Sequence, residues 1–314
     1  MKYIKDLSEG NNLKGIYYCK QKVITETKNG KPYESILLQD KTGVLDTKIW
    51  DVNNPGIREY EAGDFVDVSG EVIMFNGAKQ AKVSRLRKAE EGEYDPADYF
   101  PVTSKSIDEL FEKLLEYIDS VKNDSLRKLL QSFFVDDKEM ADRFKKASAA
   151  KSVHHGFIGG LLEHTVSVTN LCDFYAKAYP MINRDLLITA SLLHDIGKVR
   201  EISAFPENDY TDEGQLLGHI VMGAEMIGIR AAGIQGFPKK LENELKHCIL
   251  AHHGEYEYGS PKRPSLIEAV ALNFADNTDA KLETVTELLT GRDSDGWIGY
   301  NKLLDSNLRK SSQE

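Results

Sequence analysis

The stretch Leu192-Leu193-His194-Asp195-Ile196-Gly197-Lys198 decides how the larger part of this chain folds. It ends an apolar run that begins at Leu186, and a run of that composition predicts a buried helix. Burying a histidine and an aspartate at the end of such a helix costs several kcal/mol unless each is paired or binds a metal. The stretch therefore predicts a helical core arranged around a paired or metal-binding cluster.

Asp195 and Lys198 are the candidate catalytic residues of this stretch. An aspartate at this position can use both carboxylate oxygens and bridge two cations. Lys198 lies one helical turn after Asp195, on the same side, and can supply positive charge to a phosphate group. Gly197 has no side chain and leaves room for a close approach of backbone or substrate.

Histidines supply the other candidate ligands. All eight histidines of the chain fall between residues 154 and 253. Neutral imidazole binds metals near pH 7, and so tight a cluster among acids and apolar helices favours ligation over a structural role. Besides His194 and Asp195, the candidates stand in apolar stretches that predict helices. They are His164, His219, His252, His253 and Asp276.

Some neighbouring residues are expected to support this cluster. His155, together with His154, precedes the first of these helices and is a candidate contact to the substrate or to the ligands. Asp279 lies one turn after Asp276 and faces either substrate or solvent. We expect His247 to stabilise the structure or the ligands, and Glu163 to lie at the surface or to support the ligands, rather than to bind a metal.

The first ninety residues predict β-strands separated by turns. Asn29-Gly30 and Asn76-Gly77 are hairpin turns, because the Asn-Gly pair adopts positive φ readily. Strands with a gap after the third suit a small Greek-key barrel of the OB type, and tandem sandwich strands are the alternative. The predicted strands are residues 13–27, 33–39, 44–50, 65–75 and 78–86.

The remaining pattern divides the chain into domains. An acidic stretch with Pro96 and Pro101 predicts a linker, and Ser106-Ile107-Asp108-Glu109 is a capping box that opens a long helical region. In the tail, Trp297, Ile298 and Tyr300 are expected to dock on another surface. The sequence thus predicts a multidomain chain. Its parts are an all-β OB-type barrel over 1–90, a linker over 91–105, an all-α domain over 106–290 with a metal site within 150–285, and a tail over 291–314.

Composition narrows the setting in which the protein works. Its 314 residues are 41% hydrophobic and 29% charged, as in soluble globular proteins, and no apolar run is long enough to span a membrane. The first residues lack the apolar core of a signal peptide. Cys19, Cys172 and Cys248 are far apart, which suits a reducing compartment. We therefore expect a cytoplasmic protein with no membrane partner. A homo-oligomer stays open.

The charge is unevenly distributed along the chain. Residues 1–89 carry 15 Lys and Arg against 12 Asp and Glu, whereas the remainder carries 25 against 38. A slightly basic barrel suits single-stranded nucleic acid, which stacks its bases on aromatic rings beside a basic groove. Alternation buries some of these rings, and we expect Trp50 or Phe75 to be exposed. The candidates are Tyr17, Tyr33, Trp50 and Phe75, with Lys48, Lys79, Lys82, Arg85 and Arg87.

The ligand pattern, taken in order, resembles that of the HD superfamily of phosphohydrolases over roughly residues 150–285. The resemblance implies a helical fold around two divalent metal ions, with His219, His252 and His253 completing the second and Asp195 bridging. Mixed imidazole and carboxylate ligands suit Mn, Fe, Ni or Zn better than Mg or Ca. The ligands implied for the first ion are His164, His194, Asp195 and Asp276.

An OB-type barrel followed by an HD domain resembles the YhaM-type 3′-5′ exoribonucleases. The likeness includes residues 38–43, 150–155 and 276–281. It implies a hydrolase that removes nucleoside monophosphates from single-stranded RNA, with manganese favoured and single-stranded DNA left open. In this reading Lys198, His155 and Asp279 meet the substrate at the metal site, and Trp50, Phe75, Lys82 and Arg85 meet it on the barrel.

Two other functions stay open at this point. The first is a phosphohydrolase acting on nucleotides or a cyclic dinucleotide. His252-His253-Gly254-Glu255 has a local likeness to cyclic-dinucleotide HD enzymes, but Tyr258-Gly259-Ser260-Pro261 stands where their Gly-Tyr-Pro would be. The second is a protein that binds single strands with an idle HD site. The cost of burying unused acids and histidines argues against it.

Overall fold

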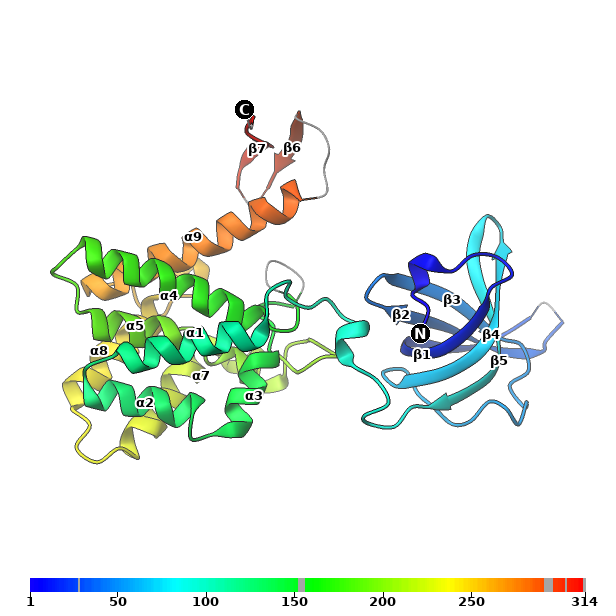
Figure 1. The fold of residues 1–314 in the computed structure, drawn as a ribbon, viewed down its shortest axis with the longest axis horizontal. Coiled ribbons are helices and arrows are strands. Elements are labelled where there is room, and N and C mark those ends of the chain that lie inside the picture. The colour runs from blue at the N-terminus through cyan, green and yellow to red at the C-terminus, as the bar shows by residue number, and fades with distance from the viewer. Residues whose placement is uncertain (28, 152–155, 291–295, 303, 313–314) are drawn as a thin grey trace. The chain divides into compact units, whose positions relative to one another are not determined.

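The structure is a computed structural model that describes residues 1–27, 29–151, 156–290, 296–302 and 304–312. The chain forms two compact units. The first comprises Met1–Pro101 and Phe205–Glu207, and the second comprises Val102–Ala204 and Asn208–Glu314. The first unit is a barrel of β-strands and the second is helical up to a terminal hairpin, which confirms the predicted fold class (Figure 1).

The described strands of the first unit close into a barrel in the order β1-β2-β3-β5-β4 (Figure 1). β3 and β5 pair in parallel and the other neighbours pair antiparallel. This is the Greek-key order of an OB fold, and closure between β1 and β4 leaves no free edge. The strands are β1 (Asn12–Glu26), β2 (Pro32–Asp40), β3 (Gly43–Ile49), β4 (Phe65–Phe75) and β5 (Ala78–Lys88).

Strand alternation decides which candidate rings of the barrel are core. Tyr17 is fully buried, and its hydroxyl donates to the carbonyl oxygen of Lys2. Trp50 and Phe75 are 41% and 56% exposed, and the Trp50 ring stacks on Tyr33 with centroids 4.7 Å apart. Tyr17 therefore fills the barrel interior, whereas Trp50 and Phe75 lie at the surface.

The acidic stretch 91–105, expected to be a linker, is in large part folded onto the barrel. Pro96 opens the 3-10 helix η2 (Pro96–Asp98), which Asp95 caps. Tyr99 and Phe100 are buried, and the Tyr94 ring stacks on Phe65 with centroids 3.7 Å apart. The sequence pattern missed this packing because aromatic residues at 94, 99 and 100 follow neither strand nor helix periodicity.

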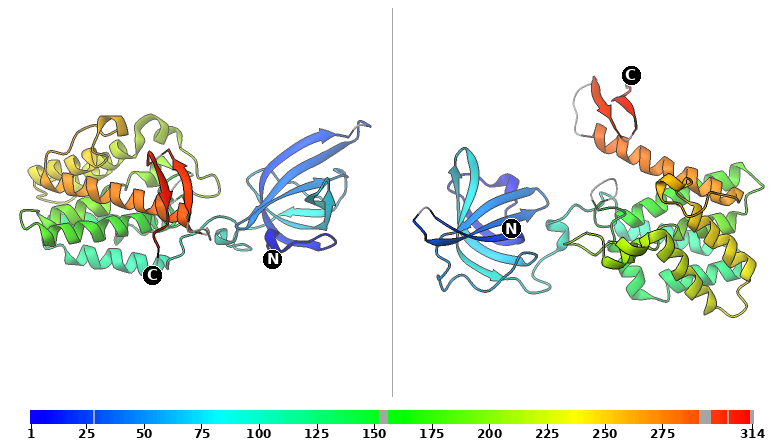
Figure 2. Two further views of the ribbon diagram at one scale, coloured as in Figure 1. Left: turned by 90° about the horizontal axis from the view of Figure 1, so that it is seen from above. Right: turned by 180° about the vertical axis from the view of Figure 1, so that it is seen from behind.

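The second unit is built from helices around a continuous apolar core. Ser106 caps the first helix by accepting from the Glu109 amide, as the capping box predicts. α4, α5 and α9 lie side by side (Figures 1 and 2), and every residue of α5 from Leu186 to Leu193 is buried. The longer helices are α1 (Ile107–Ser120), α2 (Asp124–Phe134), α3 (Lys138–Lys146), α4 (Gly160–Ala178), α5 (Arg184–Leu193), α7 (Asp212–Ala232), α8 (Lys239–Ala251) and α9 (Ile267–Leu289).

Two glycines bring α5, α7 and the short helix α6 (Lys198–Glu201) together. Gly197 packs directly on α7, where a Cβ atom would come within 2.1 Å of the His219 carbonyl oxygen. Gly218 interrupts α7 with φ 72° and ψ 152°, a conformation that favours glycine. Gly197 thus packs closely on the backbone of α7, and the helical conformation of α7 resumes at His219.

The chain ends in a hairpin of β6 (Trp297–Asn301) and β7 (Ser306–Arg309) that follows α9. Trp297 and Tyr300 are largely exposed, so the docking expected of them is not seen among the described residues. Residues 291–295, 303, 313 and 314 of the predicted tail, like Lys28 in the first hairpin turn, lie outside the described residues. Within the described ranges, no helix is both long and apolar enough to cross a membrane.

We predict that Gly197→Ala destabilises the helical unit by about 1–3 kcal/mol, because the new methyl group overlaps the α7 backbone. Thermal unfolding followed by helical circular dichroism measures the change. Gly233→Ala is the matched control, since Gly233 has helical φ and ψ and its Cβ would make an ordinary contact of 3.4 Å. Equal melting temperatures for the two variants would contradict the proposed close packing at Gly197.

Candidate metal centre

The predicted ligands converge from separate helices of the second unit. His164 comes from α4, and His194 and Asp195 come from the end of α5. His219 opens the second half of α7, and the pair His252-His253 follows α8. Asp276 comes from α9. The sequence-distant candidates therefore lie in one cluster, because α4, α8 and α9 pack on the buried helix α5 and α7 packs on α6 and α8.

One group of ligand atoms belongs to His164, His194 and Asp276, which each offer an atom within 4.8 Å of the others. The Nε2 atoms of the two histidines are 3.1 Å apart, and Asp276 Oδ1 is 3.2 Å from His164 Nε2. Asp195 Oδ2 lies 3.5 Å from His164 Nε2 and 3.4 Å from His194 Nε2. Two imidazoles and two carboxylates thus surround one point.

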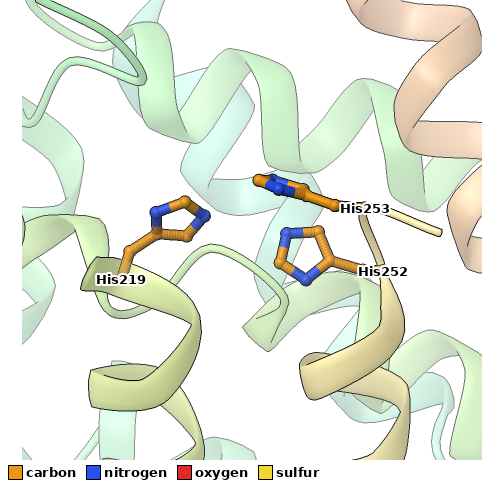
Figure 3. Close-up of side chains that lie close together, drawn as sticks. All are labelled: His219, His252 and His253. Atoms are coloured by element: carbon orange, nitrogen blue, oxygen red, sulfur yellow. The ribbon is translucent and has the colours of Figure 1, made fainter. Parts of the chain in front are cut away.

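The second group consists of His219, His252 and His253, which again offer atoms within 4.8 Å of one another (Figure 3). Asp195 Oδ1 lies 3.4 Å from His219 Nε2 and 3.6 Å from His252 Nε2. The two oxygens of Asp195 therefore face different groups, Oδ2 the first and Oδ1 the second.

Each of the five histidines is oriented through its Nδ1 atom. Carbonyl oxygens of Ser191, Ile249 and Tyr258 accept from His194, His252 and His253 at 2.8, 2.6 and 2.8 Å. Carboxylates hold the other two. Asp279 lies 2.7 Å from His164 Nδ1, and Glu201 lies 2.9 Å from His219 Nδ1. Such partners leave Nε2 as the atom that can bind a metal.

Three atoms of the cluster are buried without a hydrogen bond from any described residue. They are Asp195 Oδ1, His219 Nε2 and His252 Nε2. A buried polar atom left unsatisfied costs about 1–3 kcal/mol, so three of them at one point need an explanation. A cation between them satisfies all three, and imidazole with carboxylate is a donor set that divalent transition metals take. These residues fit a metal.

Electrostatics favour the metal-binding protonation states of His252, His253 and Asp195. Burial lowers the pKa of His252 and of His253, which keeps both imidazoles neutral. Burial raises the pKa of Asp195, but Lys198 and His194 outweigh it and hold that pKa well below the ordinary value. Burial lowers the pKa of His164, but Asp276 and Asp279 outweigh this effect and raise the pKa to about 9. A cation can replace that proton.

Lys198 lies at the cluster as the sequence predicts. Its Nζ atom is 2.7 Å from Asp195 Oδ2, one turn away, and the side chain is only 16% exposed. Burial lowers the pKa of Lys198, but the Asp195 carboxylate outweighs this effect and raises it. The lysine therefore stays charged next to the ligand Asp195.

The other residues predicted to contact the substrate differ in where they lie and in which partners they have. Asp279 contacts His164, and His154 and His155 lie outside the described residues. Lys82 and Arg85 are exposed on the barrel. By contrast, Lys48 pairs with Asp46 at 2.8 Å, and Arg87 pairs with Asp67 and Glu93 at 3.0 and 2.7 Å.

Two buried carboxylates have partners that the sequence does not reveal. Glu201 also accepts from the His219 amide, and no periodicity in the four residues of α6 indicates this. Glu163 is buried, where it accepts from Thr103 and pairs with Lys105 at 2.8 Å. His247 accepts from the Ser265 amide, in keeping with a structural role.

Comparison with known proteins gives three findings. The family model of the HD domain matches residues 161–281. A relative from Geobacillus sp. (strain WCH70), named 3′-5′ exoribonuclease YhaM, is 36% identical over 262 residues, which cover 83% of this chain and 80% of the relative. The second OB-fold domain of replication protein A from Methanococcus maripaludis aligns over 29% of this chain and 96% of its own, at 21% identity and a TM-score of 0.22.

We predict that Glu201→Gln weakens the binding of divalent cations by about 10-fold or more, because the carboxylate that orients His219 is lost. Calorimetric titration of the chelator-treated protein with Mn²⁺ measures the affinity. Glu213→Gln is the control, since Glu213 pairs with Arg200 at the start of α7. Unchanged affinity in the Glu201 variant would show that His219 needs no such partner.

Proposed function

The chain belongs to the YhaM family of 3′-5′ exoribonucleases, and from that premise we propose that it removes nucleotides from the 3′ end of single-stranded RNA. The observation that carries the proposal is the set of buried atoms of Asp195, His219 and His252 without hydrogen bonds. If the site bound no metal, these unsatisfied atoms would destabilise the folded protein and no interaction would compensate. The match to the HD-domain model over residues 161–281 supports the same hydrolytic role.

We propose that the centre binds two divalent cations, with manganese favoured and Fe, Ni or Zn as alternatives. One set of ligands is His164, His194, Asp195 and Asp276, and the other is Asp195, His219, His252 and His253. Cations held in this way would lower the pKa of a bound water and offset the negative charge of the phosphodiester. Asp195, which faces both groups, is the proposed bridge.

The chain's own residues orient the phosphate. Lys198 lies against Asp195 and keeps its positive charge, so its Nζ can donate to a phosphate oxygen as negative charge develops there. Asp279 and Glu201 hold His164 and His219 in position through Nδ1. In this account Asp279 positions a ligand, whereas the sequence pointed to a contact with the substrate.

The barrel is the proposed binding module for the rest of the strand. Trp50, backed by Tyr33, and Phe75 present exposed rings on which bases can stack. Lys82 and Arg85 add exposed positive charge for the phosphates. Single-stranded RNA is the proposed substrate, and single-stranded DNA offers the same bases and phosphates.

We also propose that the protein works in the cytoplasm. Cys19, Cys172 and Cys248 are free thiols, and all three are buried. Burial raises the pKa of Cys172 and of Cys248, which keeps them protonated and poorly reactive. A chain with these thiols needs no oxidising compartment to fold.

We predict that wild-type protein with Mn²⁺ converts a 5′-labelled single-stranded RNA into a ladder that shortens from the 3′ end. Asp195→Ala is expected to lose nearly all hydrolysis, because the carboxylate that faces both ligand groups is gone. It should still bind the strand in a filter assay, because the barrel is unchanged. The sequencing gel reads polarity and turnover together.

Substantial turnover by Asp195→Ala would contradict the metal assignment. Intact RNA with metal-loaded wild-type protein would favour a nucleotide or cyclic dinucleotide as substrate. Wild-type protein that binds RNA but retains no metal would favour a role in binding alone.

For the barrel, we predict that Trp50→Ala combined with Phe75→Ala raises the KM for a long RNA by about 10-fold or more, because two stacking rings are lost. Hydrolysis of bis-p-nitrophenyl phosphate, which has no bases to stack on the barrel, should be unchanged. Val44→Ala, which truncates another exposed apolar residue of the barrel, is the control. A wild-type KM for long RNA in the double variant would contradict the proposed role.

A further inference from the structure

Two exposed tyrosines stand on the loop that follows the last histidine of the metal centre. Residues 255–263, here called the tyrosine loop, include the 3-10 helix η3 (Tyr256–Tyr258). Tyr256 is 59% exposed and Tyr258 is 71% exposed. Aromatic rings contribute most to the free energy of folding or binding when they are buried. The functions proposed above use neither of these exposed rings.

Hydrogen bonds fix the backbone of this region against α8. The buried hydroxyl of Ser260 donates to the carbonyl oxygen of Leu250 at 3.0 Å. Just before the loop, the Asn273 amide donates to the carbonyl oxygen of His252 at 2.7 Å. The tyrosine loop therefore begins next to His253 and folds back onto α8, the helix that precedes His252 and His253.

The ring of Tyr256 is held from one side. The Arg263 guanidinium lies 5.2 Å from the ring centroid, and Arg263 pairs with Glu255 at 2.6 Å. A cation over one ring face still leaves more than half of the residue open to solvent. Because the ring is already oriented, stacking a flat partner on it costs less side-chain conformational entropy.

The tyrosine loop also contacts the metal centre directly. The Tyr258 carbonyl oxygen accepts from His253 Nδ1 at 2.8 Å. Covalent geometry keeps a tyrosine ring within roughly 7 Å of its own carbonyl oxygen. Tyr256 precedes Tyr258 by two residues in one helical turn. The Tyr258 ring thus lies within reach of a nucleotide whose phosphate is at His253, and the same helical turn carries the Tyr256 ring.

We propose that the tyrosine loop holds the base of the nucleotide being removed, with Tyr256 as the stacking ring and Tyr258 beside it. The inference rests on the proposed ribonuclease function and names its base-binding residues. Every base has a flat aromatic face, so stacking on tyrosine tolerates all four. That tolerance suits an enzyme that has to accept each terminal nucleotide in turn.

The test compares two RNA strands that differ only in the last base. One is an ordinary single strand, and the other ends in an abasic ribose. kcat/KM is measured on both strands with wild-type protein, Tyr256→Ala and Tyr256→Phe. Tyr179→Ala is the matched control, because Tyr179 is 61% exposed and lies at the end of α4, outside the tyrosine loop. The metal content of each variant shows whether the centre is intact.

Wild-type protein is expected to prefer the ordinary strand by roughly 10-fold or more, the effect of one base stacked on an aromatic ring. Tyr256→Ala should lose this preference through a lower kcat/KM on the ordinary strand, with its rate on the abasic strand unchanged. Tyr256→Phe and Tyr179→Ala should keep it.

A wild-type preference in metal-loaded Tyr256→Ala would overturn the role of Tyr256 while leaving the ribonuclease function intact. Wild-type protein that degrades neither strand would overturn the ribonuclease function itself, and this inference with it.

Discussion

The carboxylate of Asp195 is the constraint on which the second unit depends. It is almost fully buried, and its two oxygens face two separate groups of imidazoles. Burial of such a group requires compensating partners on both sides, and those partners come from helices far apart in sequence. The contact of Gly197 with α7 and the break at Gly218 bring His219 to one of these oxygens. The same contacts therefore pack the helices and position the residues of the site.

Charge explains why this arrangement attracts cations. The carboxylates of Asp195, Asp276, Asp279 and Glu201 all lie against the imidazoles, while Lys198 pairs with Asp195. When the imidazoles are neutral, the cluster is negative in a buried environment where unbalanced charge is expensive. Divalent cations bound there would restore the balance, with Lys198 held beside them by Asp195. The barrel, by contrast, presents aromatic rings and positive charges at its surface.

Much of this was predictable from the sequence, for physical reasons that differ between the units. Alternation and Asn-Gly turns place each barrel strand within two residues of its observed bounds, because strand period and turn chemistry are local signals. The cluster from His164 to Asp276 is visible because buried polar residues in apolar helices are costly. Glu201 and the contact of Asp279 with His164 depend on tertiary packing, and no local pattern reveals them. The folding of Tyr94, Tyr99 and Phe100 onto the barrel was missed for the same reason.

We propose that Asp195 lies between two cations. Electron paramagnetic resonance of the Mn²⁺-loaded protein tests it most directly, because two manganese ions joined by a bridging carboxylate are magnetically coupled. We expect a coupled spectrum in wild-type protein that becomes the six-line spectrum of isolated ions when His219 and His252 are both replaced by alanine. A six-line spectrum from fully loaded wild-type protein would contradict the two-cation centre.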